Sequence, residues 1–132
     1  MNVEQVVAVS VVVYAKDVTK VADFYKRTLL LSLLQEEAGF IVVGSDSLEI
    51  AIVRIPESIA REIQISVPPR LREETPIKCS FFVDDFQHVQ AEAAATGGGT
   101  KPLASAWLSR GELHLDGYDP EGNVVQFRIR NT

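Results

Sequence analysis

The sequence predicts an α+β fold made of two βαβββ modules, whose strands form a curved, barrel-like mixed sheet with a helix outside each module. Three observations predict it. The chain of 132 residues is 46% apolar, which suffices for one domain with a sizeable core. Two apolar runs rich in β-branched or aromatic residues each precede a helical pattern. The start of that pattern, Asp17 with Val21, returns as Asp85 with Val89 at an offset of 68 residues.

The first module is predicted over residues 1–55. Residues 6–14 are β-branched almost throughout, which is typical of a strand buried on both faces. Asp17 is a suitable N-cap for a helix over 17–30, because apolar residues recur there three and four positions apart. Three further strands are expected from the turn residues that separate them, at 31–37, 39–43 and 48–54.

A linker is predicted over residues 56–76, because this stretch holds four of the six prolines and the charged run 70–74. Within it, residues 63–67 alternate like a short edge strand. The two modules and this linker are expected to form a single domain over 1–132, since each module alone is too small to bury its own sheet.

The second module is predicted over residues 77–132 and repeats the order of the first. A strand at 77–83 precedes a helix that begins after Asp85, and Gly97-Gly98-Gly99 ends that helix because glycine adopts the left-handed cap without penalty. The tight turn Asp119-Pro120-Glu121-Gly122-Asn123 precedes the last strand. The remaining strands are expected at 101–108, 112–118 and 123–130.

Composition and charge exclude several classes of protein. A net charge of −5 and a pI near 5.0 argue against a nucleic-acid-binding face, which would be basic. One cysteine cannot form an internal disulfide, which favours a reducing compartment. The first residues lack the basic region of a signal peptide, and no apolar run reaches the ~20 residues of a membrane span. We therefore expect a cytoplasmic protein that binds neither nucleic acid nor membrane.

Three stretches resemble the vicinal oxygen chelate superfamily, which includes glyoxalase I, extradiol dioxygenases and bleomycin resistance proteins. They are SVVVYAKD (residues 10–17) with the aromatic pair Phe24-Tyr25, KCSFFVDD (78–85) and DPEGN (119–123). The resemblance covers nearly the whole chain. It implies the two-module fold, a homodimer, and a small organic molecule bound in the cavity of the barrel.

In metal-dependent members of the superfamily, the ligands project from the first and last strands of each module. The resemblance implies four such positions. Counting back seven residues from Asp17 and Asp85 gives Ser10 and Lys78 on the first strands, and Glu49 and Gln126 lie on the last strands. This set is poor for a divalent metal, because lysine is cationic, serine is a weak ligand, and catalytic zinc usually takes three protein ligands. We therefore expect no metal and no other cofactor, and we assign no catalytic residue. The alternative is a metal-dependent lyase or dioxygenase with a non-standard ligand such as His114, and a third possibility is a degenerate pocket.

Strand alternation places the polar positions on one face of their strands, and the resemblance implies that this face lines the cavity. Two interpretations are open for Lys78 and Glu49: a buried ion pair that holds the modules in register, or a polar spot that orients a ligand. Trp107, the only tryptophan, is either part of the core or, as the resemblance implies, a residue that stacks on a planar ligand. The predicted ligand-binding residues are Ser10, Glu49, Lys78, Phe82, Trp107 and Gln126.

Overall fold

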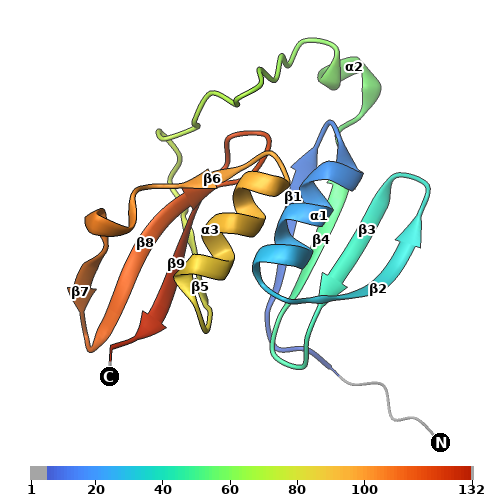
Figure 1. Cartoon of the computed structure of the whole chain (residues 1–132). Helices are drawn as coiled ribbons and strands as arrows, with labels where there is room; N and C mark the ends of the chain where they lie inside the picture. Colours follow the sequence, from blue (N-terminus) through green and yellow to red (C-terminus); the bar gives the residue numbers. More distant parts are fainter. Residues whose placement is uncertain (1–5, 132) are drawn as a thin grey trace, which may run out of the picture.

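The computed structural model describes residues 6–131, and the first part of this range forms a four-stranded sheet with one long helix (Figure 1). The elements in chain order are β1 (Ser10–Ala15), α1 (Val18–Thr28), β2 (Ser32–Glu37), β3 (Phe40–Gly44) and β4 (Glu49–Arg54). The strands lie in the order β1-β4-β3-β2, in which β1 is parallel to β4 and the other pairs are antiparallel. β1 is therefore an edge strand.

The second part of the chain builds a similar sheet after a linker that contains the short helix α2 (Glu57–Ala60). The strand order is β5-β9-β8-β6, with β7 also paired to β8, and β5 is the edge strand parallel to β9. Two mixed sheets, each with a helix, confirm the predicted α+β fold of paired βαβββ modules. The elements are β5 (Cys79–Phe82), α3 (Phe86–Ala95), β6 (Gly99–Thr100), η1 (Leu103–Ser105), β7 (Trp107–Ser109), β8 (Glu112–Tyr118) and β9 (Val124–Arg130).

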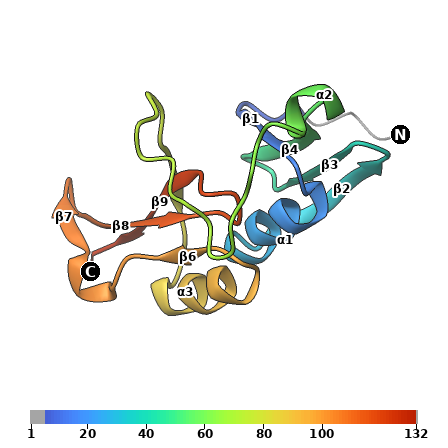
Figure 2. The ribbon, with the colours of Figure 1, turned by 90° about the horizontal axis from the view of Figure 1, so that it is seen from above.

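Both long helices lie on the same side of the two sheets and pack against each other (Figures 1 and 2). Each begins at its predicted cap: the side chain of Asp17 accepts a hydrogen bond from Lys20 N at 3.0 Å, and Asp85 accepts one from Gln87 N at 2.8 Å. Within residues 6–131, no helix has the length and apolar composition that crossing a membrane requires. The core between helices and sheets is formed by apolar side chains that include Val21, Phe24, Ile50, Ile52, Val89, Leu115 and Phe127.

Three local predictions are wrong. β1 begins at Ser10, and Val12 and Tyr14 are 54% and 60% exposed, because α1 covers only one face of this edge strand. Residues 63–67 form no strand, since no neighbouring strand pairs with them. Residues 101–108 divide into η1 and the start of β7 instead of forming one strand, which agrees with the missing backbone N–H of Pro102.

The turn at residues 119–123 ties the second sheet to the first helix. The Tyr25 hydroxyl on α1 donates a buried 2.8 Å hydrogen bond to Asp119. The buried carboxylate of Glu121 accepts hydrogen bonds from the backbone N–H groups of Lys16 and Asp17, at 3.0 and 2.8 Å, where α1 begins. These bonds hold the two modules against each other, so this turn positions whatever lies between the sheets.

The Tyr25 hydroxyl is expected to make stability fall at alkaline pH. Burial raises the pKa of Tyr25 well above its usual value, and the neighbouring Asp119 carboxylate adds to the shift. Because the folded-state pKa exceeds the unfolded one, the contribution is complete below about pH 10 and declines as pH rises further. In urea unfolding, the stability advantage of the wild type over Tyr25→Phe should therefore shrink above about pH 10. An advantage that stays constant from neutral to strongly alkaline pH would contradict this role.

Candidate ligand-binding site

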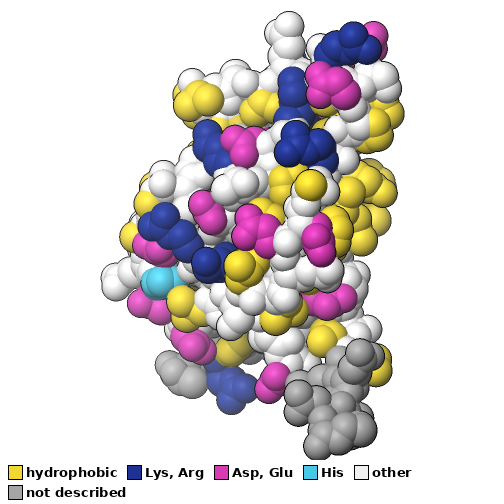
Figure 3. All heavy atoms as spheres, turned by 90° about the vertical axis from the view of Figure 1, so that its right-hand side faces the viewer, with side chains coloured by type: hydrophobic (Ala, Val, Ile, Leu, Met, Phe, Trp, Pro, Cys, Tyr) yellow, Lys and Arg dark blue, Asp and Glu magenta, His cyan; other side chains and the backbone are white. Residues whose placement is uncertain are grey.

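The face of each sheet that points away from the helices, which we call the open face, carries most of the predicted site residues. Alternation along the strands puts Leu115 and Phe127 in the core and their neighbours on the open face. Exposed hydrophobic side chains are visible on the flank of the molecule where β2 lies (Figure 3). The open face of the first sheet includes Ser10, Val12, Tyr14, Glu49, Ala51 and Val53, and that of the second includes Ser80, Phe82, His114, Asp116, Gln126 and Arg128.

The polar positions of the two modules do not align as the sequence count predicted. In the first sheet, Ser10 lies opposite Glu49. In the second sheet, Ser80 and not Lys78 lies opposite Gln126, and its Oγ donates to Gln126 Oε1 at 2.7 Å. Counting back seven residues from each helix cap aligned Lys78 with Ser10, but the parallel pairing of β5 with β9 shifts the register by two residues. Ser80 is thus a candidate site residue that the count from the helix caps missed.

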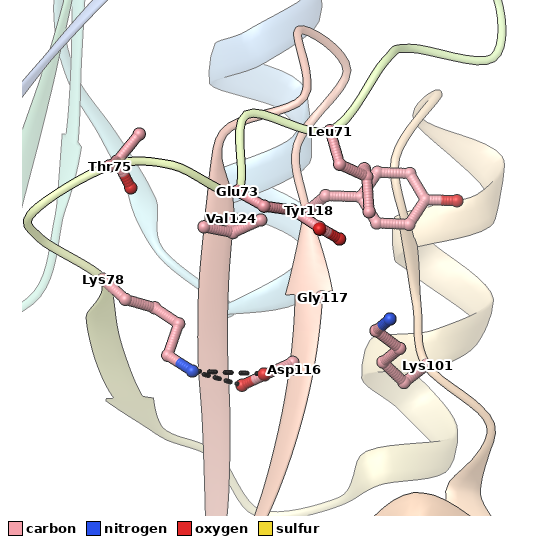
Figure 4. A pocket seen from close by; sticks show the side chains of 9 residues that line it. All are labelled: Leu71, Glu73, Thr75, Lys78, Lys101, Asp116, Gly117, Tyr118 and Val124. Atoms are coloured by element: carbon pink, nitrogen blue, oxygen red, sulfur yellow. Dashed lines mark hydrogen bonds and ion pairs between the residues drawn. The ribbon is translucent and has the colours of Figure 1, made fainter.

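Lys78 turns toward the second sheet. Its Nζ lies 3.0 and 3.1 Å from the two carboxylate oxygens of Asp116 on β8 (Figure 4). The ion pair considered between Lys78 and Glu49 is therefore not formed. Both partners of the observed pair remain partly exposed, with side-chain exposures of 38% and 30%, so we expect the pair to contribute little to stability.

Trp107 lies on the open face, stacked on a histidine. Its indole ring is 5.4 Å from the His114 ring, with 19° between the planes, and Lys78 Nζ lies 5.8 Å from the indole centroid. His114 is only 4% exposed, and its Nδ1 has no hydrogen-bond partner. Sequence alternation alone could not orient His114; its pairing with Trp107 and Arg128 across β7, β8 and β9 does.

Phe82 and Arg128 lie beside this cluster. They are cross-strand neighbours, and the Arg128 guanidinium lies 5.9 Å from the centroid of the Phe82 ring. Arg128 also donates a 3.0 Å hydrogen bond to Glu112. A single polar and aromatic surface thus runs across the second sheet from Ser80 to Trp107.

A trough runs between β1 and β5, the facing edges of the two sheets, which are not paired with each other. It consists of two adjoining cavities of 520 and 430 Å³, and Val11, Cys79 and Phe81 line both. The larger cavity also contacts Leu31, Phe82 and Arg128, and the smaller one contacts Tyr14 and Ile50. Of the predicted site residues, Phe82 lines the trough, whereas Lys78 lines a separate pocket and Ser10, Glu49, Trp107 and Gln126 line neither.

Cys79 at the centre of the trough is half-buried, and this burial raises the pKa of its thiol. The thiol therefore stays protonated near neutral pH. A protonated thiol is a poor nucleophile, so the position favours a packing role for Cys79.

The donor set does not fit a divalent metal. The amide oxygen of Gln126 already accepts a hydrogen bond from Ser80, and the ammonium group of Lys78 is paired with Asp116. Among residues 6–131, no group of three or more His, Cys, Asp or Glu side chains is arranged to hold an ion.

Solved structures share this architecture over almost the whole chain. A glyoxalase/bleomycin resistance protein/dioxygenase family enzyme from Burkholderia phytofirmans PsJN matches 92% of this chain and 96% of its own, with a TM-score of 0.65 and 14% identity. A glyoxalase/bleomycin resistance protein from Albidiferax ferrireducens T118 also matches 92% of this chain and 96% of its own, with a TM-score of 0.64 and 17% identity. The chain has the vicinal oxygen chelate fold.

A bleomycin resistance determinant encoded on the transposon Tn5 also has this fold. It matches 93% of this chain and 97% of its own, with a TM-score of 0.57 and 15% identity. No family model and no curated protein matches the sequence. The similarity to the vicinal oxygen chelate proteins is therefore a similarity of fold.

Proposed function

We propose that the chain binds a small, largely apolar organic molecule in the trough between β1 and β5, without a divalent metal. The observation that carries the proposal is the pair of adjoining cavities of 520 and 430 Å³, lined mainly by apolar side chains from both sheets. Cavities of this size suit drug-sized ligands, and a few polar groups at their rim orient such ligands. Ser80 and Arg128 supply these polar groups at one end.

The fold supports this proposal, since one solved structure that shares it is a bleomycin resistance determinant. The exposed Val12 and Tyr14 on the open face also support a homodimer, because a second copy would remove this apolar surface from water. The homodimer and the cytoplasmic location remain predictions. The predicted ligand contacts of Ser10, Glu49, Trp107 and Gln126 remain proposals. These residues lie outside the trough on the open faces, and a ligand would meet them only if it extended out over those faces.

Native mass spectrometry of protein purified without chelator tests the proposal directly. We expect a dimer without stoichiometric zinc, nickel, iron or manganese, and binding of one anilinonaphthalene sulfonate per chain as an apolar probe. Stoichiometric metal would contradict the metal-free proposal. Failure of the probe to bind, together with the absence of any copurified organic molecule, would contradict the proposed function.

The lone cysteine locates the bound probe, because Cys79 lines both cavities. A saturating concentration of the probe should slow the reaction of Cys79 with a disulfide reagent by roughly ten-fold, since access decides the rate for a half-buried thiol. The matched control, Cys79→Ser with Ser58→Cys, moves the thiol to the exposed helix α2. Its reaction should be unchanged by the probe, and equal protection of both thiols would mean that the probe does not occupy the trough.

A further inference from the structure

A second pocket lies on the open face of the second sheet, beneath the linker (Figure 4). Its volume is 350 Å³, and it shares only Val124 with the trough. The linker supplies Leu71, Glu73 and Thr75, and the body of the second module supplies Lys78, Lys101, Asp116, Gly117, Tyr118 and Val124.

Backbone contacts fix the walls of this pocket. The backbone N–H of Arg72 donates to Gly122 O at 2.8 Å, and residue 72 forms a β-bridge with Asn123. The linker passes so close to this turn that a Cβ on Gly122 would lie 2.0 Å from Arg70 O. On the opposite wall, the backbone N–H of Lys101 donates to Asp116 O at 2.9 Å. The linker and the β6 segment are therefore both anchored, and the pocket exists before any ligand arrives.

The charges in the pocket are of two kinds. Lys78 and Asp116 neutralise each other. In contrast, Lys101 and Glu73 take part in no ion pair within residues 6–131. The Lys101 ammonium and the Glu73 carboxylate approach the space around Gly117 from opposite sides (Figure 4). The pocket thus presents one unpaired cation and one unpaired anion, each from a different wall.

We propose that this pocket binds a small zwitterion, an α-amino acid with an apolar side chain. Its carboxylate would pair with Lys101 and its ammonium group with Glu73, because each of these exposed charges then meets its opposite. Its side chain would contact the apolar wall of Leu71 and Val124. A ligand with only one charge would leave either Lys101 or Glu73 without a partner.

Amide chemical shifts in an NMR titration test the proposal with three probes. L-Leucine carries both charges, N-acetyl-L-leucine lacks the ammonium group, and L-leucinamide lacks the carboxylate. We expect L-leucine to shift the amides of Glu73, Lys101 and Gly117, and each one-charge analogue to bind about ten-fold more weakly. Tighter or equal binding of either analogue would overturn the zwitterion proposal, as would the absence of L-leucine binding.

Two variants assign the charges. Lys101→Met should weaken L-leucine binding about ten-fold while leaving L-leucinamide binding unchanged. Glu73→Gln should also weaken L-leucine binding about ten-fold, but it should leave N-acetyl-L-leucine binding unchanged. Lys26→Met removes an exposed lysine of α1 that lies outside the pocket, and it should change nothing. An equal effect of Lys26→Met and Lys101→Met would mean that the loss of binding follows the net charge of the protein, and it would contradict the proposed site.

Discussion

Asp119→Ala is expected to lower the free energy of unfolding by about 3 kcal/mol, because the fully buried carboxylate is a multiple hydrogen-bond acceptor. It accepts from the Tyr25 hydroxyl and the Asn123 amide, both at 2.8 Å, and from the backbone N–H groups of Glu121 and Asn123, at 2.9 and 3.1 Å. The substitution leaves these donors without their acceptor. It also releases the turn whose Glu121 binds the start of α1.

Asp116→Ala is the matched control, since it makes the same substitution on the neighbouring strand β8. Asp116 loses only a partly exposed ion pair with Lys78, which is worth at most about 1 kcal/mol. Urea unfolding of both variants measures the difference. Equal losses would show that the turn does not hold the modules together. If it does, Asp119→Ala should also weaken probe binding in the trough, because the same bonds set the separation of β1 and β5.

Gly98→Ala is expected to cost about 3 kcal/mol, because a Cβ at this position has no room. It would lie 2.3 Å from the backbone oxygen of Tyr118 and 2.7 Å from the fully buried ring of Phe24. Neither neighbour can move freely, since Tyr118 belongs to β8 and Phe24 to the core. Gly98 is therefore required by the close approach of α3's end to the second sheet, whereas Gly97, at φ +96°, supplies the left-handed turn that ends the helix.

Gly111→Ala separates crowding from backbone strain. Gly111 has φ +75°, but nothing lies within 4 Å of a Cβ built there. Its replacement should cost only the left-handed conformation, roughly 1 kcal/mol. Thermal or urea unfolding that gave Gly98→Ala a cost no greater than Gly111→Ala would contradict the packing argument.

The elements that local sequence specifies were predicted well. The two helices begin at Asp17 and Asp85 because a side-chain acceptor at the N-cap is a local property of the chain. Most strands were also predicted, because an alternating or continuously apolar pattern is likewise a local property of the chain. The wrong strand predictions concern segments whose structure depends on pairing with another strand. Residues 63–67 alternate but have no partner strand, and residues 6–9 lie beyond the end of β4, with which β1 pairs.

The candidate site depended on long-range geometry. Lys78 pairs with Asp116, 38 residues away, instead of Glu49, and Ser80 takes the place opposite Gln126 because β5 and β9 pair in a register that counting from the helix cap does not reveal. The direction of His114 likewise follows from β7 lying beside β8.

By itself, the sequence determined the repeated βαβββ order, the helix caps and the turn at residues 119–123, because each of these depends on residues that are close in the chain. Only the tertiary structure decided that this turn binds α1 through residues 94 positions apart, that a trough opens between β1 and β5, and that Lys101 and Glu73 line the same pocket. These features arise where segments distant in the chain meet, and local spacing carries no information about such meetings.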